Sequence, residues 1–322
     1  MDSLKIIPYC IPDEDIEYNF FKNYPSFNLT EQEEEFDFFN RIDAAVELFF
    51  QKAFTEIEPL LDEIALREIH LVSDYTGMII KNQSIASWLF GRSKTENGHY
   101  ILIASPTLIS ASLHLVNNPD VNVGNNICST WQHELIHLAD QKAILRSGKW
   151  CEYNSDCMIR RKYLSSFREE GIADLWYLGK GHAVAITLDA GRIRFQQDLE
   201  RIAAIDLTTL KNRKAYGRLV NDTEKTYSAG PVMVLHALSV SSDEEIAKQA
   251  KLALEKIADR TLLSNEEIFS LIRAAIKMDI ETFMTALENP ADDGKPFTNL
   301  KCIKETILYK KIQLHEDTCC AS

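Results

Sequence analysis

Several features that mark other classes of protein are missing from this sequence. Its 35 Lys and Arg face 48 Asp and Glu, a formal net charge of −13, so it lacks the basic excess of a nucleic-acid-binding protein. No apolar run is long enough to cross a bilayer, and the first residues lack the basic start and apolar stretch of a secretory signal. A glycine-rich phosphate loop and a serine nucleophile elbow are also missing. We therefore expect no nucleic-acid partner, no membrane span and no serine-hydrolase chemistry.

The cysteines form no regular framework. The seven cysteines are an odd number at scattered positions, unlike the even, regularly spaced set of a disulfide-stapled secreted domain. The expected location is therefore the cytoplasm. Hydrophobic residues make up 45% and charged residues 26% of the 322 positions, which is ordinary for a globular protein with one large or two moderate domains.

Five consecutive residues carry the strongest functional signal. His133-Glu134-Leu135-Ile136-His137 has the form His-Glu-x-x-His, within a segment predicted to be helical. Two histidines four residues apart lie one turn apart on the same face of a helix, so both imidazoles can bind one Zn²⁺. Glu134 can take a proton from a zinc-bound water and act as general base in hydrolysis. The alternative is an amphipathic helix with two polar histidines and an exposed glutamate.

A catalytic zinc site needs a third protein ligand and leaves a fourth position for water. Glu169 and Glu170 are the two candidates, and either can be the one that points inward. The stretch Glu170-Gly-Ile-Ala resembles the second zinc helix of the gluzincin metallopeptidases, the clan of thermolysin and aminopeptidase N, and this resemblance favours Glu170. Asp174 lies one turn further on the same face and can fix the tautomer of a ligand histidine, which we expect to be His133. The alternative is a pair of solvated acids on an exposed helix.

A later segment also resembles this clan. Tyr227, followed by Gly230 and a helical run, is similar to a segment of aminopeptidase N relatives whose tyrosine hydroxyl supports the oxyanion of the tetrahedral intermediate. The resemblance makes Tyr227 the candidate for that role. The alternatives are that Tyr227 only packs at a helix start, or that the donor is His236 or Tyr216.

The chain also departs from the clan in three respects, one of which is that the 32 residues between His137 and Glu170 exceed the spacing usual in the thermolysin and aminopeptidase N families. Glu169 stands where the thermolysin pattern has asparagine before the third ligand. The Gly-x-Met-Glu-Asn stretch that holds the free amino group of an aminopeptidase substrate does not occur. The resemblance therefore favours an endopeptidase and supports the clan, over about residues 70 to 240, rather than one family within it.

The predicted fold class is α+β, with a zincin-like metallopeptidase core in which a small mixed sheet accompanies the zinc helix. A helical N-terminal region (1–66), a sheet and zinc-helix lobe (67–180), a helical C-terminal lobe (181–298) and a tail (299–322) are expected. Strand patterns fall at 69–73, 77–80, 84–90 and 99–104, with turns at 82 and 91–98. The strand at 99–103 is either the sheet edge to which substrate adds or an interior strand.

Helical patterns fill most of the remaining sequence. After a capping box at Thr30 and Glu33, apolar residues recur every three or four positions, as expected for core packing: Phe36, Phe39, Ile42, Val46, Phe49 and Phe50. Further helices are expected at 191–205, 230–239, 243–259, 264–276 and 279–288. Ser242 with Glu245, and Ser264 with Glu267, have capping-box spacing.

The last four residues, Cys319-Cys320-Ala321-Ser322, have the form of a prenylation box, and a terminal serine favours farnesyl on Cys319. A single lipid gives weak, reversible attachment, so peripheral membrane association is expected. The alternative is a disordered tail with two incidental cysteines. Prenylation belongs to eukaryotic cells. If the box is used, the protein is therefore either eukaryotic or an effector that an intracellular bacterium delivers into a host cell.

Together these patterns predict a zinc metalloendopeptidase with one Zn²⁺ per chain. Its substrates would be proteins or peptides from a narrow intracellular set, because an undirected protease in the cytoplasm would damage the cell. The oligomeric state is left open. The alternative is a binding module on a gluzincin scaffold, in which zinc is structural and catalysis is idle.

Overall fold

The computed structural model describes residues 5–10, 35–63, 68–73, 91–96, 99–104, 106–117, 121–146, 155–181, 187–213, 226–303, 305–306 and 310. The chain divides into two compact units, Met1–Lys142 and Ala143–Ser322, and each is described by itself. The four-part division expected from the sequence stays a prediction.

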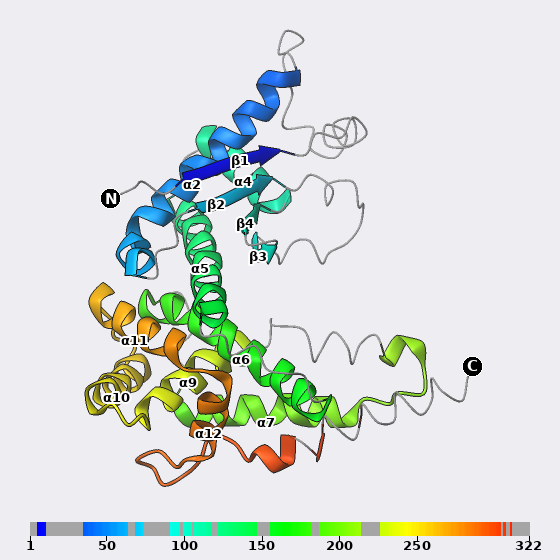
Figure 1. Ribbon diagram of the computed structural model, residues 1–322, viewed down its shortest axis with the longest axis vertical. Coiled ribbons are helices and arrows are strands. Elements are labelled where there is room, and N and C mark those ends of the chain that lie inside the picture. Colours follow the sequence, from blue (N-terminus) through cyan, green and yellow to red (C-terminus); the bar gives the residue numbers. More distant parts are fainter. Residues whose placement is uncertain are drawn as a thin grey trace. The chain divides into compact units, whose positions relative to one another are not determined.

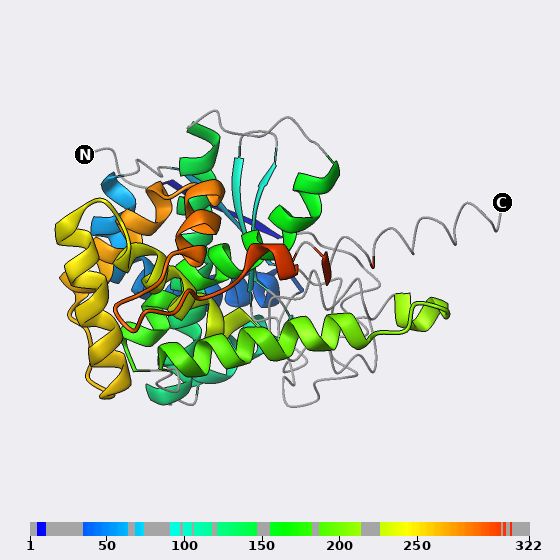
Figure 2. The same cartoon turned by 90° about the horizontal axis from the view of Figure 1, so that it is seen from below.

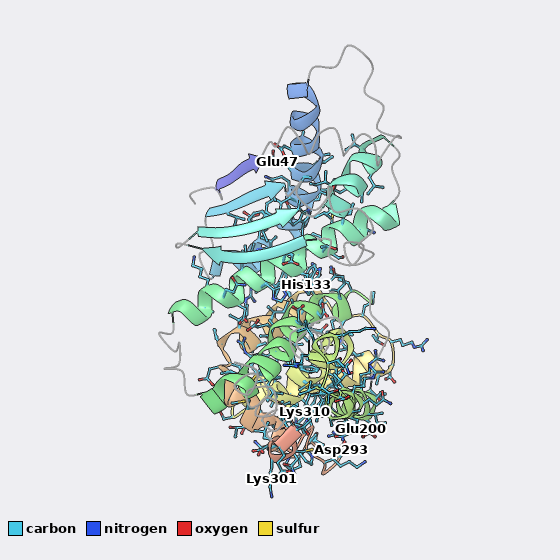
Figure 3. All side chains as sticks on the ribbon, turned by 90° about the vertical axis from the view of Figure 1, so that its right-hand side faces the viewer. Glu47, His133, Glu200, Asp293, Lys301 and Lys310 are labelled. Atoms are coloured by element: carbon cyan, nitrogen blue, oxygen red, sulfur yellow. The ribbon has the colours of Figure 1, made fainter. Side chains whose placement is uncertain are left out.

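The first unit contains a four-stranded sheet. Its strands are β1 (Lys5–Cys10), β2 (Glu68–Ser73), β3 (Gly91–Glu96) and β4 (His99–Ala104), each six residues long. They are ordered β1-β2-β4-β3, as Figure 3 shows, with β1 and β4 parallel to β2 and β3 antiparallel to β4. The strand at 99–104 is therefore interior, and its prediction as the sheet edge is wrong. Among the described strands, β1 and β3 are the two edges of the sheet.

One face of this sheet is packed against helices. Leu71 pairs with Leu102, and both are buried together with Ile69 and Ala104, which lie on the same face because side chains alternate along a strand. Helix α2 (Glu35–Glu63) contacts β1, and α4 (Pro106–Asn117) contacts α2 and β4 (Figure 1). The core of this unit is therefore a sandwich of sheet and helices.

Helix α2 also supports α5 (Val121–Arg146), the helix that carries the two histidines. Val46, Phe49 and Phe50 are buried, as their spacing predicted. The ring of Phe50 meets Trp131 of α5 edge-on at 5.7 Å between centroids. Beside it, the Gln132 amide donates to the Ala53 carbonyl at 3.3 Å and to Glu56 at 3.0 Å. Aromatic packing and a buried amide thus fix α5 against α2.

The second unit is helical, and its centre is α9 (Thr226–Ser239). Every α9 residue from 229 to 239 is buried, which requires partners on all sides of the helix. These partners are α6 (Ser155–Gly179), α7 (Leu188–Ala204), α10 (Glu244–Ala258), α11 (Asn265–Lys277) and α12 (Ile280–Glu288). Figures 1 and 2 show α9 enclosed among them and α7 running as one uninterrupted helix.

Two glycines let α6 approach α9 closely. A Cβ atom added to Gly171 would lie 2.4 Å from the carbonyl oxygen of Gly230, and one added to Gly230 would lie 2.9 Å from the carbonyl oxygen of Phe167. No side chain other than hydrogen fits at either position without movement of the backbone. The two helices therefore cross with their backbones in contact, immediately next to Glu170.

Hydrogen bonds from Arg192 to Asp293 and Lys295, here called the Arg192 clip, hold the loop that follows α12. Arg192 of α7 donates to both carboxylate oxygens of Asp293 and, at 2.6 Å, to the Lys295 carbonyl. The Arg192 guanidinium holds the pKa of Asp293 down, at about 2, with help from the Lys295 backbone N–H. Asp293 is labelled in Figure 3. This clip joins residues 101 positions apart in the sequence.

The predicted α+β class is wrong, because the described residues are mostly helical. Nine helices take up most of them, against four strands of six residues. The strand-like patterns at 67–104 cover a short part of the chain compared with the helical periodicity elsewhere, and α4 lies where no helix was predicted. The expected strands at 77–80 and 84–90 lie outside the described residues. Residues 91–96, expected as a turn, form β3.

The helices of the second unit begin and end close to their predicted positions, but one predicted cap is wrong. Asp243, and not Ser242, caps α10 by accepting from the N–H groups of Glu245 and Ile246. The capping box of Ser264 and Glu267 is confirmed. The box at Thr30 lies outside the described residues. None of the described helices combines the length and apolarity that a membrane crossing requires.

Candidate metal centre

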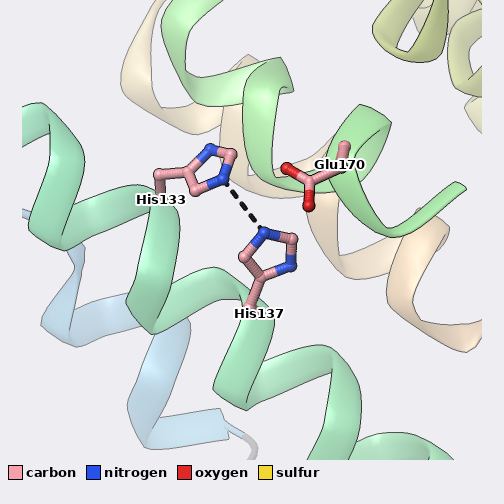
Figure 4. A group of neighbouring side chains, drawn as sticks. All are labelled: His133, His137 and Glu170. Carbon is pink, nitrogen blue, oxygen red and sulfur yellow. Dashed lines mark hydrogen bonds between the residues drawn. The ribbon is translucent and has the colours of Figure 1, made fainter. Parts of the chain in front are cut away.

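His133 and His137 converge on one point beside α5. Their Nε2 atoms are 3.0 Å apart, and their rings are nearly perpendicular, at 86° (Figure 4). Two nitrogen ligands of a tetrahedral zinc, each about 2.0–2.1 Å from the ion, are about 3.3 Å from each other. The helical spacing of the motif therefore gives nearly the separation that a shared metal ion needs, as the sequence predicted.

Glu170 completes a group of three possible ligands. One ligand atom from each of His133, His137 and Glu170 lies within 4.8 Å of the others, and Figure 4 shows the carboxylate directed toward the two rings. His133 is buried and the other two are half-buried. Glu169 is not part of the group, so the structure selects Glu170 from the two adjacent acids. This group can hold a metal ion.

Glu134 lies between the two histidines in the sequence and is buried on α5, with 9% of its surface exposed. It is offset from His133 by about 100° around the helix axis, the angle between consecutive helical residues. This offset leaves Glu134 outside the ligand group while keeping it next to the first histidine. The expected role of Glu134 as proton acceptor stays a prediction.

Two further buried carboxylates share the helix faces of the ligands. Asp174 is 5% exposed and lies one turn after Glu170 on α6. The predicted hydrogen bond between Asp174 and the second ring nitrogen of His133, Nδ1, is not formed in the structure. Asp140 is 1% exposed and lies one turn after His137 on α5. Sequence reasoning missed Asp140, although its spacing of three from His137 places it on the same helix face.

Tyr227, the predicted oxyanion donor, belongs to the first turn of α9. Tyr227 is the second residue of α9, one turn before Gly230, and its side chain lies outside the described part. Gly230 contacts Gly171, so the first turn of α9, which contains Tyr227, lies next to the point where α6 and α9 cross beside Glu170. Tyr216 and Cys319 also lie outside the described residues. The roles of Tyr227 and Cys319 stay predictions.

His236, the alternative donor, is a core histidine. It is fully buried, its Nε2 lies 3.0 Å from the Asn289 carbonyl, and its ring packs near Phe297. Burial lowers the pKa of His236, against a smaller opposing effect from the Asn289 carbonyl. A fully buried ring cannot touch a substrate, so this alternative is excluded.

A cysteine nucleophile is also disfavoured on α5. Cys128 is half-buried, and its Sγ lies 3.7 Å from the Phe49 carbonyl, to which the thiol can donate. Burial raises the pKa of the Cys128 thiol, and the effect of nearby Glu56 in the same direction is opposed by that of Lys52. A thiol with a raised pKa remains protonated at neutral pH, so Cys128 serves packing.

Arg168 is a second residue that sequence reasoning missed. It is 2% exposed on α6, two residues before Glu170, and it donates to backbone carbonyls at the end of α11. The only sequence signal was a charged residue within an otherwise apolar stripe of α6. A buried arginine must have acceptors, but the sequence does not show which ones.

Comparison with known proteins adds no relative to this description. No protein-family model, no curated protein and no solved structure matches the chain.

Proposed function

We propose that this protein is a zinc-dependent peptidase that hydrolyses internal peptide bonds. The observation that carries the proposal is the group of His133, His137 and Glu170 with Glu134 beside the first histidine. Three protein ligands leave a fourth position open, which distinguishes a catalytic zinc site from a closed structural one. Two imidazoles and one carboxylate are a donor set that suits Zn²⁺.

When bound, Zn²⁺ would supply Lewis acidity toward a water molecule and a peptide carbonyl. The chain's own residues would then move the proton. Glu134 would accept a proton from the attacking water and pass it to the leaving amine. Tyr227 would donate a hydrogen bond to the oxygen on which negative charge grows in the transition state.

The proposed substrate is a protein from a narrow intracellular set. The missing Gly-x-Met-Glu-Asn stretch argues against capture of a free amino terminus, so internal bonds are the better target. The second candidate function is a binding module in which the same metal site has only a structural role.

Metal content and proteolysis test the proposal together. We expect one zinc per purified chain, and less than one in each of His133→Ala, His137→Ala and Glu170→Ala. Glu134→Gln should keep the zinc but lose hydrolysis of a proteome-derived peptide library, because glutamine is nearly isosteric and cannot take a proton. Equal turnover by Glu134→Gln and wild type would contradict the mechanism. Stoichiometric zinc without turnover in wild type would favour the binding module.

A further inference from the structure

Arg168 donates hydrogen bonds to the end of the neighbouring helix α11, a set of contacts called here the Arg168 grip. Its Nε donates to the Met278 carbonyl at 2.9 Å, and its Nη2 lies 3.3 Å from the Ala275 carbonyl and 3.4 Å from that of Ile276. These three residues form the last turn and the C-cap of α11. The α6 backbone is therefore tied to the end of α11 at a position two residues before Glu170.

The charge of Arg168 explains why this contact is firm. The last carbonyls of a helix have no partners within the helix and carry the negative end of its dipole. A buried guanidinium that donates to several of them satisfies those carbonyls and its own need for acceptors. A rotation of α6 would break these bonds and leave both sides buried without water.

Helix geometry connects this grip to the choice of metal ligand. Consecutive residues point about 100° apart around a helix, so Arg168 and Glu170 project about 200° apart, onto nearly opposite faces. Gly171 projects within about 60° of Arg168 and faces α9 at the glycine crossing. Because Arg168 and Gly171 are fixed against α11 and α9 on one side of α6, Glu170 points from the opposite side of α6. A rotation of about 100° would instead present Glu169.

We propose that Arg168 is a positioning residue that sets the rotation of α6 and so makes Glu170, rather than Glu169, the ligand. This inference rests on the proposed metal site. It assigns Arg168 no contact with metal or substrate, because its guanidinium is held at the end of α11. The consequence is specific: without the grip, the two adjacent acids should become more nearly equivalent as ligands.

Zinc affinity, measured by chelator competition on the full chain, gives the first readout. Arg168→Met keeps an apolar stem but removes all the donors. We expect its zinc dissociation constant to rise on the order of tenfold or more, the range typical when a residue that orients a ligand is lost. Arg192→Met is the matched control, because its guanidinium also binds several oxygens but contacts Asp293, Lys295 and Asp189, all outside α5 and α6. It should lose stability and keep its zinc affinity.

The second readout separates positioning from general loss of stability. Glu169→Gln and Glu170→Gln are each made in the wild-type and the Arg168→Met backgrounds. In wild type, only Glu170→Gln should weaken zinc binding strongly. In Arg168→Met, the two substitutions should have effects within about threefold of each other, because neither acid is held in place. A purely structural arginine would leave the preference for Glu170 unchanged.

The outcomes are distinct. If wild type binds no zinc, the proposed metal site itself is wrong. If wild type binds zinc and Arg168→Met keeps both the affinity and the full preference for Glu170, Arg168 is not a positioning residue. Should Arg168→Met fail to fold, Arg168→Lys decides by the same two readouts, because one ammonium cannot reach all three carbonyls in the fork geometry of arginine. Wild-type behaviour of Arg168→Lys in both readouts would then reject the inference.

Discussion

Replacing Gly171 with alanine tests the closest helix contact of the second unit. The added Cβ would lie 2.4 Å and 2.5 Å from the carbonyl oxygen and carbon of Gly230, and 2.8 Å from a methyl group of Val234. An ordinary contact begins at 3.4 Å, so α6 must move by about 1 Å at this point. Backbone atoms cannot rotate aside as a flexible side chain can.

The magnitude follows from two opposing effects. Overpacking of a core costs about 1–3 kcal/mol, and a clash with backbone belongs at the upper end. Alanine gains about 1 kcal/mol over glycine inside a helix. The net expectation is a loss of about 2 kcal/mol, or a melting temperature lower by about 4–8 °C for a unit of this size. Zinc affinity should fall as well, because Glu170 is the neighbouring residue.

Gly124→Ala is the matched control. A Cβ at Gly124 of α5 would meet only Phe49, at an ordinary 3.6 Å. The same substitution should therefore stabilise the chain there by about 0.5–1 kcal/mol. Urea unfolding followed by circular dichroism compares the two variants in one buffer. If both variants change the free energy of unfolding with the same sign and within about 0.5 kcal/mol of each other, the glycine crossing does not limit the helix approach.

Other predictions concern the catalytic donor, pH and helix caps. Tyr227→Phe should lower kcat about 10²-fold with little change in KM, and a rate within about twofold of wild type would reject its role. The folded-state pKa of His236 is lowered, so the unfolded chain binds the proton more readily, and stability should fall as the pH drops below the unfolded value of 6.5. His236→Gln should flatten urea-derived stability between pH 7 and 5, and an unchanged slope would locate the titration elsewhere. Ser264→Ala should cost about 0.5–2 kcal/mol in the same assay, while Ser242→Ala should cost almost nothing because Asp243 is the cap. Equal losses in the two serine variants would contradict this assignment.

The sequence revealed features that depend on local spacing. The zinc-type histidine pair needs only the helical period, and the helix starting after Ser264 needs only its capping box and apolar stripe. Only the resemblance of the Glu170-Gly-Ile-Ala stretch favoured Glu170 over Glu169, because spacing alone cannot decide between adjacent acids on one helix. Its rotation depends on Arg168 meeting α11, more than a hundred residues away.

The strands show which parts of the sheet could not be predicted from the sequence. Residues 91–96 contain glycine and charged residues, which disfavour strands, yet pairing with β4 makes them one. Lys5–Cys10 contains Pro8, which counts against a strand, yet it pairs with β2. Strand formation here depends on neighbours in space, whereas the helices follow from their own periodicity.

The Arg192 clip has a consequence for the order in which the chain is made. Arg192 leaves the ribosome 101 residues before its partner Asp293, a delay of about 5–20 s at ordinary rates of synthesis. Until then, its nearby acid Asp189 is available, but the loop carbonyl and carboxylate do not yet exist. A nascent chain stopped before Asp293 would therefore expose an arginine that the finished protein nearly buries. The C-terminal half must be completed before α7 reaches its final contacts.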